Sequence, residues 1–238
     1  MIDKAAAAGK LTADSPSNLK AWLTREALQE YRPKLEALIR SEKWQELDAM
    51  FWTAIPFGTG GRRGPMGEMG PATINDRTIA ESAHGMAVYL RSTGVATGGS
   101  VVIAHDTRNH SSRFARIAAS TFAAHGLKVY LFDSHRATPV LSYAVRKLGC
   151  NIGVMISASH NPPADNGFKA YWSNGGQVIA PHDKGIIREV ERAEVIPTMS
   201  FARGVSLGEI EIIGEEIDND YVQEVVRLSE SKSRSLRG

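Results

Sequence analysis

The chain contains a single cysteine, Cys150, so it can form neither an internal disulfide nor a cysteine-based zinc cluster. Cys150 begins an apolar run, and we interpret it as a small core residue in a protein from a reducing compartment. No apolar run approaches the roughly 18 residues that a membrane-spanning helix needs. The alanine run from Ala5 to Ala8 is too short and too weak for a secretory signal. We therefore expect a cytoplasmic protein with no membrane partner.

The chain also lacks an excess of charge of either sign. Its 28 Lys and Arg residues nearly balance 26 Asp and Glu residues, which leaves a net charge of +2 over 238 residues. The chain therefore lacks the excess of positive charge that nucleic-acid-binding proteins commonly carry, and we expect no nucleic-acid partner. An anionic ligand would have to be recognised by a few local cations. The hydrophobic fraction of 42% is typical of a soluble globular protein.

The first fifty residues read as helical. Apolar side chains recur at helical spacing from Leu28 to Ile39 and again from Trp44 to Phe51. Pro56 and the glycine-rich run 58–64 then interrupt the pattern. We predict an N-terminal helical arm over 1–54, a main domain over 55–215, and a linker helix with a tail over 216–238.

Apolar strands alternate with amphipathic helices through the main domain. Helical patterns around 79–90, 114–122 and 141–148 precede the apolar runs Val101–Ala104, Val129–Phe132 and Ile152–Ile156. Strands that are apolar on both faces and alternate with helices are typical of a parallel sheet covered on both sides. The sequence therefore predicts an α/β fold, with a mostly parallel sheet sandwiched by helices.

The carboxyl-terminal part is less regular. Ser173-Asn174-Gly175-Gly176 is a hairpin-turn signal, which predicts an antiparallel edge hairpin within 168–178. We expect a helix over 181–193, a strand over 209–213 and a last helix that ends near Leu228, capped by Asp218 or Asp220. The serine- and charge-rich segment 229–238 is interpreted as a linker or frayed tail.

A polar loop follows the apolar strand that ends at Ile156. In open α/β sheets ligands collect at the carboxyl ends of the strands. A serine on such a loop can act as a nucleophile when a base accepts its proton and cations offset the developing charge. An ordinary polar connection is the alternative that spacing alone leaves open.

The loop sequence Ser157-Ala158-Ser159-His160-Asn161-Pro162, followed by Asp165-Asn166-Gly167-Phe168-Lys169, resembles the phosphoserine loop of the α-D-phosphohexomutases. These are the phosphoglucomutase and phosphomannomutase superfamily. Upstream, Phe57-Gly58-Thr59-Gly60-Gly61-Arg62-Arg63-Gly64 resembles the arginine loop of the same family. The resemblance covers about residues 50 to 225 and corresponds to domain I. The helical arm is most similar to the phosphoglucomutase and phosphopentomutase branch.

The resemblance implies roles for the residues of the serine loop. Ser159 matches the serine that carries the phosphoryl group and, through its phosphate, ligates magnesium. His160 is implied in catalysis, and His160 and Asn161 would shape the loop and contact the phosphoryl group. Lys169 matches a lysine that acts as an acid or base, which suits phosphoryl transfer because positioning and charge stabilisation dominate that reaction.

The resemblance also assigns phosphate contacts outside that loop. Thr59 and Arg63 belong to the arginine loop, and the planar guanidinium of Arg63 can grip phosphate oxygens in a bidentate way. Arg62 is interpreted as a neighbour that faces solvent. Arg108 follows a strand end in an Asp-x-Arg segment and would orient the loop of Ser159, although a structural pair with Asp106 is an open alternative.

Part of the family pattern is missing from the sequence. The aspartate-rich loop that holds magnesium in the family is absent, and Asp218-Asn219-Asp220 is the nearest approach. Ser159 alone would not hold a magnesium ion, which prefers several oxygen ligands. We therefore expect a fragment that is inactive alone, with sugar phosphates and domains II to IV as partners. The complete enzyme would use Mg²⁺ and a sugar bisphosphate activator.

Two other functions compete with a phosphosugar mutase. A non-catalytic phosphosugar-binding module would keep the fold and the anion-binding loops. A serine hydrolase is disfavoured, because Ser159 lies between Ala158 and His160 and not in a Gly-x-Ser-x-Gly elbow. The sequence does not distinguish glucose, mannose or pentose phosphates.

Overall fold

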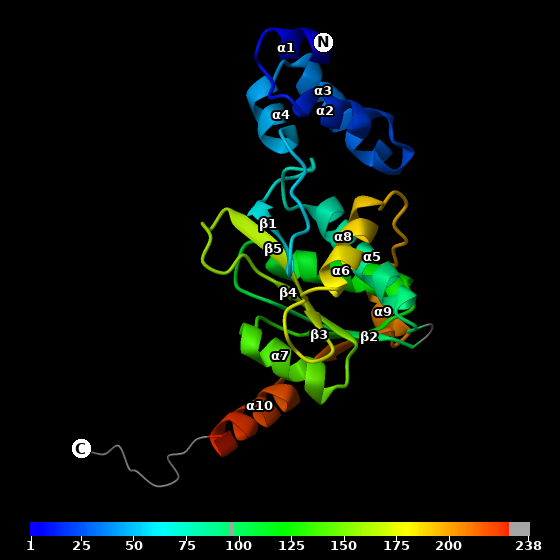
Figure 1. Ribbon diagram of the computed structural model, residues 1–238, viewed down its shortest axis with the longest axis vertical. Helices are drawn as coiled ribbons and strands as arrows, with labels where there is room; N and C mark the ends of the chain where they lie inside the picture. Colours follow the sequence, from blue (N-terminus) through cyan, green and yellow to red (C-terminus); the bar gives the residue numbers. More distant parts are fainter. Residues whose placement is uncertain (96–97, 229–238) are drawn as a thin grey trace, which may run out of the picture.

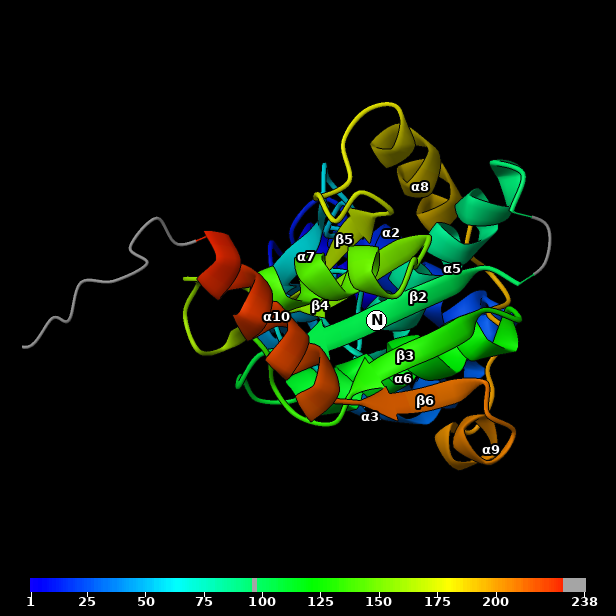
Figure 2. The same cartoon turned by 90° about the horizontal axis from the view of Figure 1, so that it is seen from below.

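A mixed sheet of six strands forms the centre of the main domain. The computed structural model describes residues 1–95 and 98–228, so the tail predicted over 229–238 lies outside the described residues. The strand order is β1-β5-β4-β2-β3-β6 (Figures 1 and 2). β4, β2, β3 and β6 are parallel, whereas β5 is antiparallel to both of its neighbours. The strand bounds are β1 Gly61–Pro65, β2 Ser100–His105, β3 Lys128–Phe132, β4 Ile152–Ile156, β5 Asp165–Trp172 and β6 Ile210–Ile213.

Helices cover both faces of this sheet, which confirms the predicted α/β fold. Along β2, Val101 and Ile103 pack on one side, whereas Val102 and Ala104 pack on the other, because successive side chains of a strand alternate. The first side is covered by α5 Asp76–Ser92, α6 Ser111–Ala124 and α8 His182–Glu191. The second is covered by α7 Thr138–Lys147 and α10 Glu215–Leu228, which lie in front of the strands in Figure 2.

The N-terminal residues form a separate helical layer at one end of the long axis (Figure 1). Four α-helices and one 3₁₀-helix, η1, build it, and Trp22, Leu35 and Phe51 lie in its own apolar cluster. This cluster also takes in Met69, a residue of the main domain that is 1% exposed. The bounds are α1 Ile2–Ala7, α2 Ser15–Thr24, η1 Glu26–Tyr31, α3 Arg32–Arg40 and α4 Trp44–Phe51.

The antiparallel edge is present, but its outer strand is not the predicted one. The turn at 173–176 forms, since Gly175 N–H donates to the Trp172 carbonyl, yet Gln177 makes only an isolated bridge with Tyr171. The strand beside β5 is instead β1, which lies in the glycine-rich run that we expected to be a loop. Glycine permits this pairing, because a Cβ on Gly61 would lie 2.0 Å from the Phe168 carbonyl oxygen.

Two further details differ from the expectation. A short helix, α9 Phe201–Ser206, precedes β6 in a stretch that sequence left irregular. The last helix begins at Glu215, so the predicted caps at Asp218 and Asp220 are wrong. Both carboxylates lie inside the helix, where they pair with Arg136 and Lys147. None of the helices in residues 1–95 and 98–228 combines the length and the hydropathy that crossing a bilayer requires.

Candidate functional site

The loop over 157–164 joins β4 to β5 at the carboxyl end of β4. It lies beside the segment that follows β2, because β2 and β4 are adjacent and parallel. Side chains from both segments, among them Asp106, Arg108, Ser157 and Ser159, line a cavity of about 570 Å³. The site therefore occupies the sheet edge at which α/β proteins bind ligands.

Ser159 presents its hydroxyl to a lysine on the neighbouring strand. The ammonium of Lys169 donates to Ser159 Oγ at 2.5 Å. Ser159 has a backbone φ of 57°, a left-handed conformation that is uncommon for residues other than glycine. Its N–H donates to Ser157 Oγ at 2.9 Å, which helps to hold this turn. The arrangement exposes a serine hydroxyl in direct contact with a potential proton acceptor.

The environment of Lys169 favours its neutral form. Burial lowers the pKa of the ammonium, and the nearby charges of Arg63 and Arg108 lower it further. The carboxylate of Asp106 opposes this shift in pKa. Arg63 pairs with Gly167 and Gly61 pairs with Lys169, so Arg63 and Lys169 project from the same face of the sheet.

Arg108 holds the serine loop by its backbone. Its terminal nitrogens donate to the carbonyls of Ser159, Asn161, Pro162 and Asp165 at 2.7–3.1 Å. Its Nε lies 3.4 Å from Asp106 Oδ2. The four N–H groups of the two terminal nitrogens are therefore all engaged with carbonyls, and Nε forms an ion pair with Asp106. This geometry is that of an arginine that orients the loop. For a terminal nitrogen of Arg108 to bind a phosphate, one of its hydrogen bonds to a loop carbonyl would have to break.

A buried asparagine connects this clamp to helix α6. Asn166 is 0% exposed, and its Nδ2 donates to the Asn109 carbonyl and to Ser111 Oγ at 3.0 and 2.9 Å. Ser111 Oγ in turn donates to Asp106 Oδ1 at 2.7 Å. Sequence reasoning missed this network. The available signal was a polar Asn-Gly pair directly before the buried Phe168.

The structure does not bring every predicted side chain to Ser159. Thr59 Oγ1 donates to Asp183 Oδ2 at 3.0 Å, so its hydroxyl is engaged at the start of α8. His160 and Arg63 are exposed and make no hydrogen bond or ion pair within the described part of the chain. Asn161 Nδ2 donates to Asp165 Oδ2 at 2.8 Å and fixes the loop internally. The phosphate-binding roles of these side chains stay predictions.

The expectation for Arg62 is wrong. Its side chain is only 9% exposed and lies 3.2 Å from Glu81 Oε2 on α5, with a further hydrogen bond to the Thr78 carbonyl. Arg62 and Arg63 point to opposite faces of β1 because strand side chains alternate. Arg62 therefore ties the edge strand to a helix.

The residues around Ser159 do not fit a magnesium site. Within 1–95 and 98–228, no group of three or more His, Cys, Asp or Glu side chains has a metal-binding arrangement. Asp218 and Asp220, the nearest sequence match, are paired with Arg136 and Lys147. Magnesium prefers an octahedral set of oxygen ligands, which these residues do not supply.

Comparison with known proteins shows which family the chain resembles. The family model for phosphoglucomutase/phosphomannomutase, alpha/beta/alpha domain I, matches residues 54–196. The chain is 42% identical over 165 residues to human phosphopentomutase and 39% identical over 183 residues to phosphoribomutase of Saccharomyces cerevisiae. It is 38% identical over 177 residues to human glucose 1,6-bisphosphate synthase.

These matches cover much of this chain and a minor part of each relative. They span 66%, 74% and 71% of the chain but only 27%, 29% and 28% of the three relatives, in the order given. Among solved structures, a phosphoglucomutase/phosphomannomutase family protein from Burkholderia thailandensis superposes with a TM-score of 0.56 at 21% identity, over 74% of this chain and 36% of the other. Parafusin from Paramecium superposes with a TM-score of 0.59 at 16% identity, over 75% of this chain and 35% of the other.

At such identities the structural likeness shows the fold alone, whereas the match over 54–196 spans more than half of the chain. The serine loop, Arg108 and Lys169 all lie inside that match. The chain therefore belongs to the phosphoglucomutase/phosphomannomutase family of phosphosugar mutases and contains its α/β/α domain I.

Proposed function

We propose that this chain is the phosphoryl-carrying domain of a phosphosugar mutase, in which Ser159 accepts a phosphoryl group and returns it to a sugar. The observation that carries this proposal is the contact of 2.5 Å between Lys169 Nζ and Ser159 Oγ. A serine hydroxyl is a weak nucleophile until a neighbouring base accepts its proton. The lowered pKa of Lys169 increases the neutral fraction that can do so.

In the carrier half-reaction, a sugar bisphosphate gives one phosphoryl group to Ser159. The bond between phosphorus and Ser159 Oγ forms as the bond between phosphorus and the sugar oxygen breaks. The hydroxyl proton passes from Ser159 to the amine of Lys169, and then to the departing sugar oxygen. The Arg63 cation, together with Lys169 once it has accepted the proton, lies on one sheet face and offsets the phosphoryl charge. The reverse half-reaction returns the group to a sugar hydroxyl.

The substrate class follows from the relatives. Their names specify phosphopentomutase, phosphoribomutase and glucose 1,6-bisphosphate synthase, so we propose pentose or hexose monophosphates as substrates and a sugar bisphosphate as the activator. We propose that the 238 residues alone have no mutase turnover, with the family's further domains as partners and a cytoplasmic location. Dependence on magnesium would require ligands from outside the described residues.

The carrier half-reaction can be tested on the chain itself. The purified protein is incubated with glucose 1,6-bisphosphate, and intact mass with peptide mapping follows phosphate on Ser159. We expect one phosphoryl group, none in Ser159→Ala, and transfer slowed by about 10²-fold or more in Lys169→Met, since a lost general base commonly costs that much. Ser17→Ala, an exposed serine on α2, is the matched control. Phosphate on another residue, or an unchanged rate in Lys169→Met, would contradict the proposal.

A non-catalytic phosphosugar-binding module is the second candidate. The observation in its favour is the exposed Arg63, which has no ion-pair partner among the described residues and shares a sheet face with Lys169. Titration with glucose 1,6-bisphosphate separates the two functions. Binding that survives Ser159→Ala, is lost in Arg63→Ala and never yields phosphoserine supports the module.

A further inference from the structure

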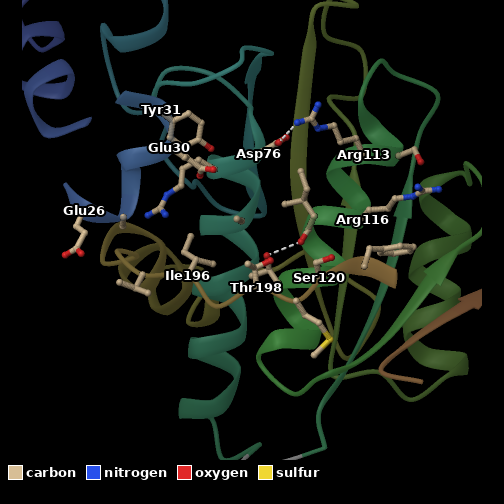
Figure 3. Close-up of a pocket in the computed structure, with 18 residues that line it drawn as sticks. Glu26, Glu30, Tyr31, Asp76, Arg113, Arg116, Ser120, Ile196 and Thr198 are labelled. Carbon is tan, nitrogen blue, oxygen red and sulfur yellow. Dashed lines mark hydrogen bonds and ion pairs between the residues drawn. The ribbon is translucent and has the colours of Figure 1, made fainter. Parts of the chain in front are cut away.

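A large cavity lies away from Ser159, within the part of the chain that the structure describes. Its volume is about 940 Å³, and it opens between η1 of the arm, helices α5 and α6, and the segment over 195–201 (Figure 3). None of its lining residues belongs to the serine loop, β1 or β5. Sites for small molecules commonly measure about 300 to 1,000 Å³, so the cavity is large enough for a ligand of that size.

One part of the lining is apolar and aromatic. Ile117 of α6, Met199 and Phe201, the first residue of α9, line this part of the cavity, and Tyr31 of η1 lines its arm side. All four are only partly buried, because the cavity leaves one side of each without a packing partner. Flat rings make favourable contacts with such a surface.

A cation lies on the α6 side of the cavity. The guanidinium of Arg116 lies 5.2 Å from the centre of the Phe201 ring, a cation–π arrangement that fixes the side chain. Arg116 forms no ion pair within the described residues, whereas its neighbour Arg113 is paired with Asp76. A guanidinium that is positioned and unpaired is suited to bind a phosphate.

The opposite wall offers hydrogen-bond acceptors. Glu30 is exposed on η1 and forms no ion pair in the described part of the chain, whereas the Glu26 side chain points away from the other labelled residues (Figure 3). A carboxylate of this kind commonly accepts hydrogen bonds from ribose hydroxyls. Burial raises the pKa of Tyr31, and the carboxylates of Glu30 and Asp76 add to the shift, so the phenol keeps its proton and can donate.

We propose that this cavity binds a nucleoside monophosphate, with the phosphate on Arg116, the base against Phe201 and Ile117, and the ribose hydroxyls toward Glu30. A sugar phosphate would leave the apolar wall uncovered, and an uncharged nucleoside would leave Arg116 unpaired. The site shares no residue with the proposed phosphoryl carrier. Its existence is therefore independent of the function proposed for Ser159.

Calorimetric titration of the whole chain with adenosine 5′-monophosphate tests the proposal. We expect saturable binding with one molecule per chain, and binding at least about tenfold weaker for both adenosine and ribose 5-phosphate, since each lacks one of the recognised parts. Arg116→Ala should weaken nucleotide binding by a similar factor. Arg192→Ala, an exposed arginine after α8, is the matched control and should leave it unchanged.

A second variant tests the location by filling the space. Ala80 is half-buried on α5 and lines the cavity, so Ala80→Phe should abolish nucleotide binding while circular dichroism shows an intact fold. Ser159→Ala should bind the nucleotide as the parent chain does. The proposal is overturned if the parent chain does not bind the nucleotide, if Arg116→Ala and Ala80→Phe bind it normally, or if Arg63→Ala abolishes the binding.

Discussion

Among single residues, Arg108 determines the shape of the candidate site. Its contacts run to four loop carbonyls and to Asp106, and its side chain is 14% exposed. The left-handed backbone at Ser159 costs free energy in any residue with a side chain. The clamp supplies the hydrogen bonds that offset this cost, and so keeps the Ser159 hydroxyl within reach of Lys169.

Replacement of Arg108 should loosen the loop before it unfolds the protein. Arg108→Lys keeps one charge but loses the planar fork, so we expect faster amide hydrogen exchange over 157–164 and at least about tenfold slower phosphorylation of Ser159. Peptide-level exchange mass spectrometry and the carrier assay measure these effects. Arg40→Ala, an exposed arginine on α3, should change neither. Normal phosphorylation in Arg108→Lys would show that the clamp has no positioning role.

A pair of histidines makes stability depend on pH. His125 Nε2 lies 3.0 Å from His84 Nδ1 between α5 and the end of α6. Burial lowers the pKa of His125 to about 4, and the His84 imidazole and the Arg91 guanidinium add to the shift. The pKa of His84 is also lowered, with burial as the main cause.

Because the folded state favours neutral histidines, the unfolded chain binds more protons in acid. Stability should therefore be fully present above about pH 6.5, the ordinary histidine value, and be lost as the pH falls toward 4. We expect the urea midpoint to fall between pH 7 and pH 5, and to fall less in His125→Gln. An equal drop in the parent and in His125→Gln would assign the effect to other groups.

Among the elements, the packing of α5 against α8 depends on two glycines. A Cβ on Gly85 of α5 would lie 2.6 Å from the Val190 backbone nitrogen of α8. On α8, a Cβ at Gly185 would lie 2.0 Å from the Tyr89 ring of α5. The two helix backbones approach closely at Gly85, where no flexible side-chain tip can yield, whereas Gly185 leaves room for the Tyr89 ring.

Gly85→Ala therefore tests this packing, because the close contact predicts a loss of folding stability where an open helix surface would give a gain. On an open helix surface the change would stabilise by about 1 kcal/mol, because alanine has the higher helix propensity. Here we expect destabilisation by about 1–3 kcal/mol, as in other overpacked interiors. Chemical unfolding measures the difference, and Ser92→Ala on the exposed end of α5 should be nearly neutral. A stabilised Gly85→Ala would mean that α8 moves away at little cost.

The elements also show what sequence can specify. β2, β3 and β4 were predicted within about two residues, because buried parallel strands are continuous apolar runs. β1 was missed because Gly61-Arg62-Arg63-Gly64 has no apolar alternation, and its pairing depends on β5, a hundred residues later. The burial of Arg62 was missed for a related reason. Its partner Glu81 lies on another element, and no local pattern indicates it.

The sequence could indicate residues of the candidate site, but not the contacts that support them. The resemblance to a known family pointed to Ser159 and Lys169 as site residues. The structure places Lys169 Nζ 2.5 Å from Ser159 Oγ. The spacing of these residues in the sequence could not predict this contact, because it depends on how the loop over 157–164 leads into β5. The hydroxyl of Thr59 is engaged with Asp183, a partner that only the packing of α8 against the edge of the sheet provides.

In the whole molecule, the arm and the sheet domain are joined through Met69. This side chain is 1% exposed, yet it lies in the apolar cluster of the arm. A backbone contact reinforces the junction, because Ala72 N–H donates to the Met50 carbonyl. The arm is thus packed onto the main domain and is not merely tethered to it.

Met69→Ala should weaken this junction selectively. Truncation of a buried methionine commonly costs about 2–5 kcal/mol, and here the loss falls on the arm cluster. We expect limited proteolysis to cleave within residues 1–54 sooner, with the main domain protected. Gln45→Ala, an exposed side chain on α4 of the arm, is the control. Equal sensitivity of both parts would indicate that they unfold as one unit.

The clamp at Arg108 has a consequence for how the loop can diverge among relatives. All of its loop contacts are to main-chain carbonyls, which every amino acid possesses. The side chains of Pro163 and Ala164 can therefore vary without altering the path of the chain. Substitutions at these positions can therefore change the rim of the cavity while the backbone geometry of Ser159 is kept.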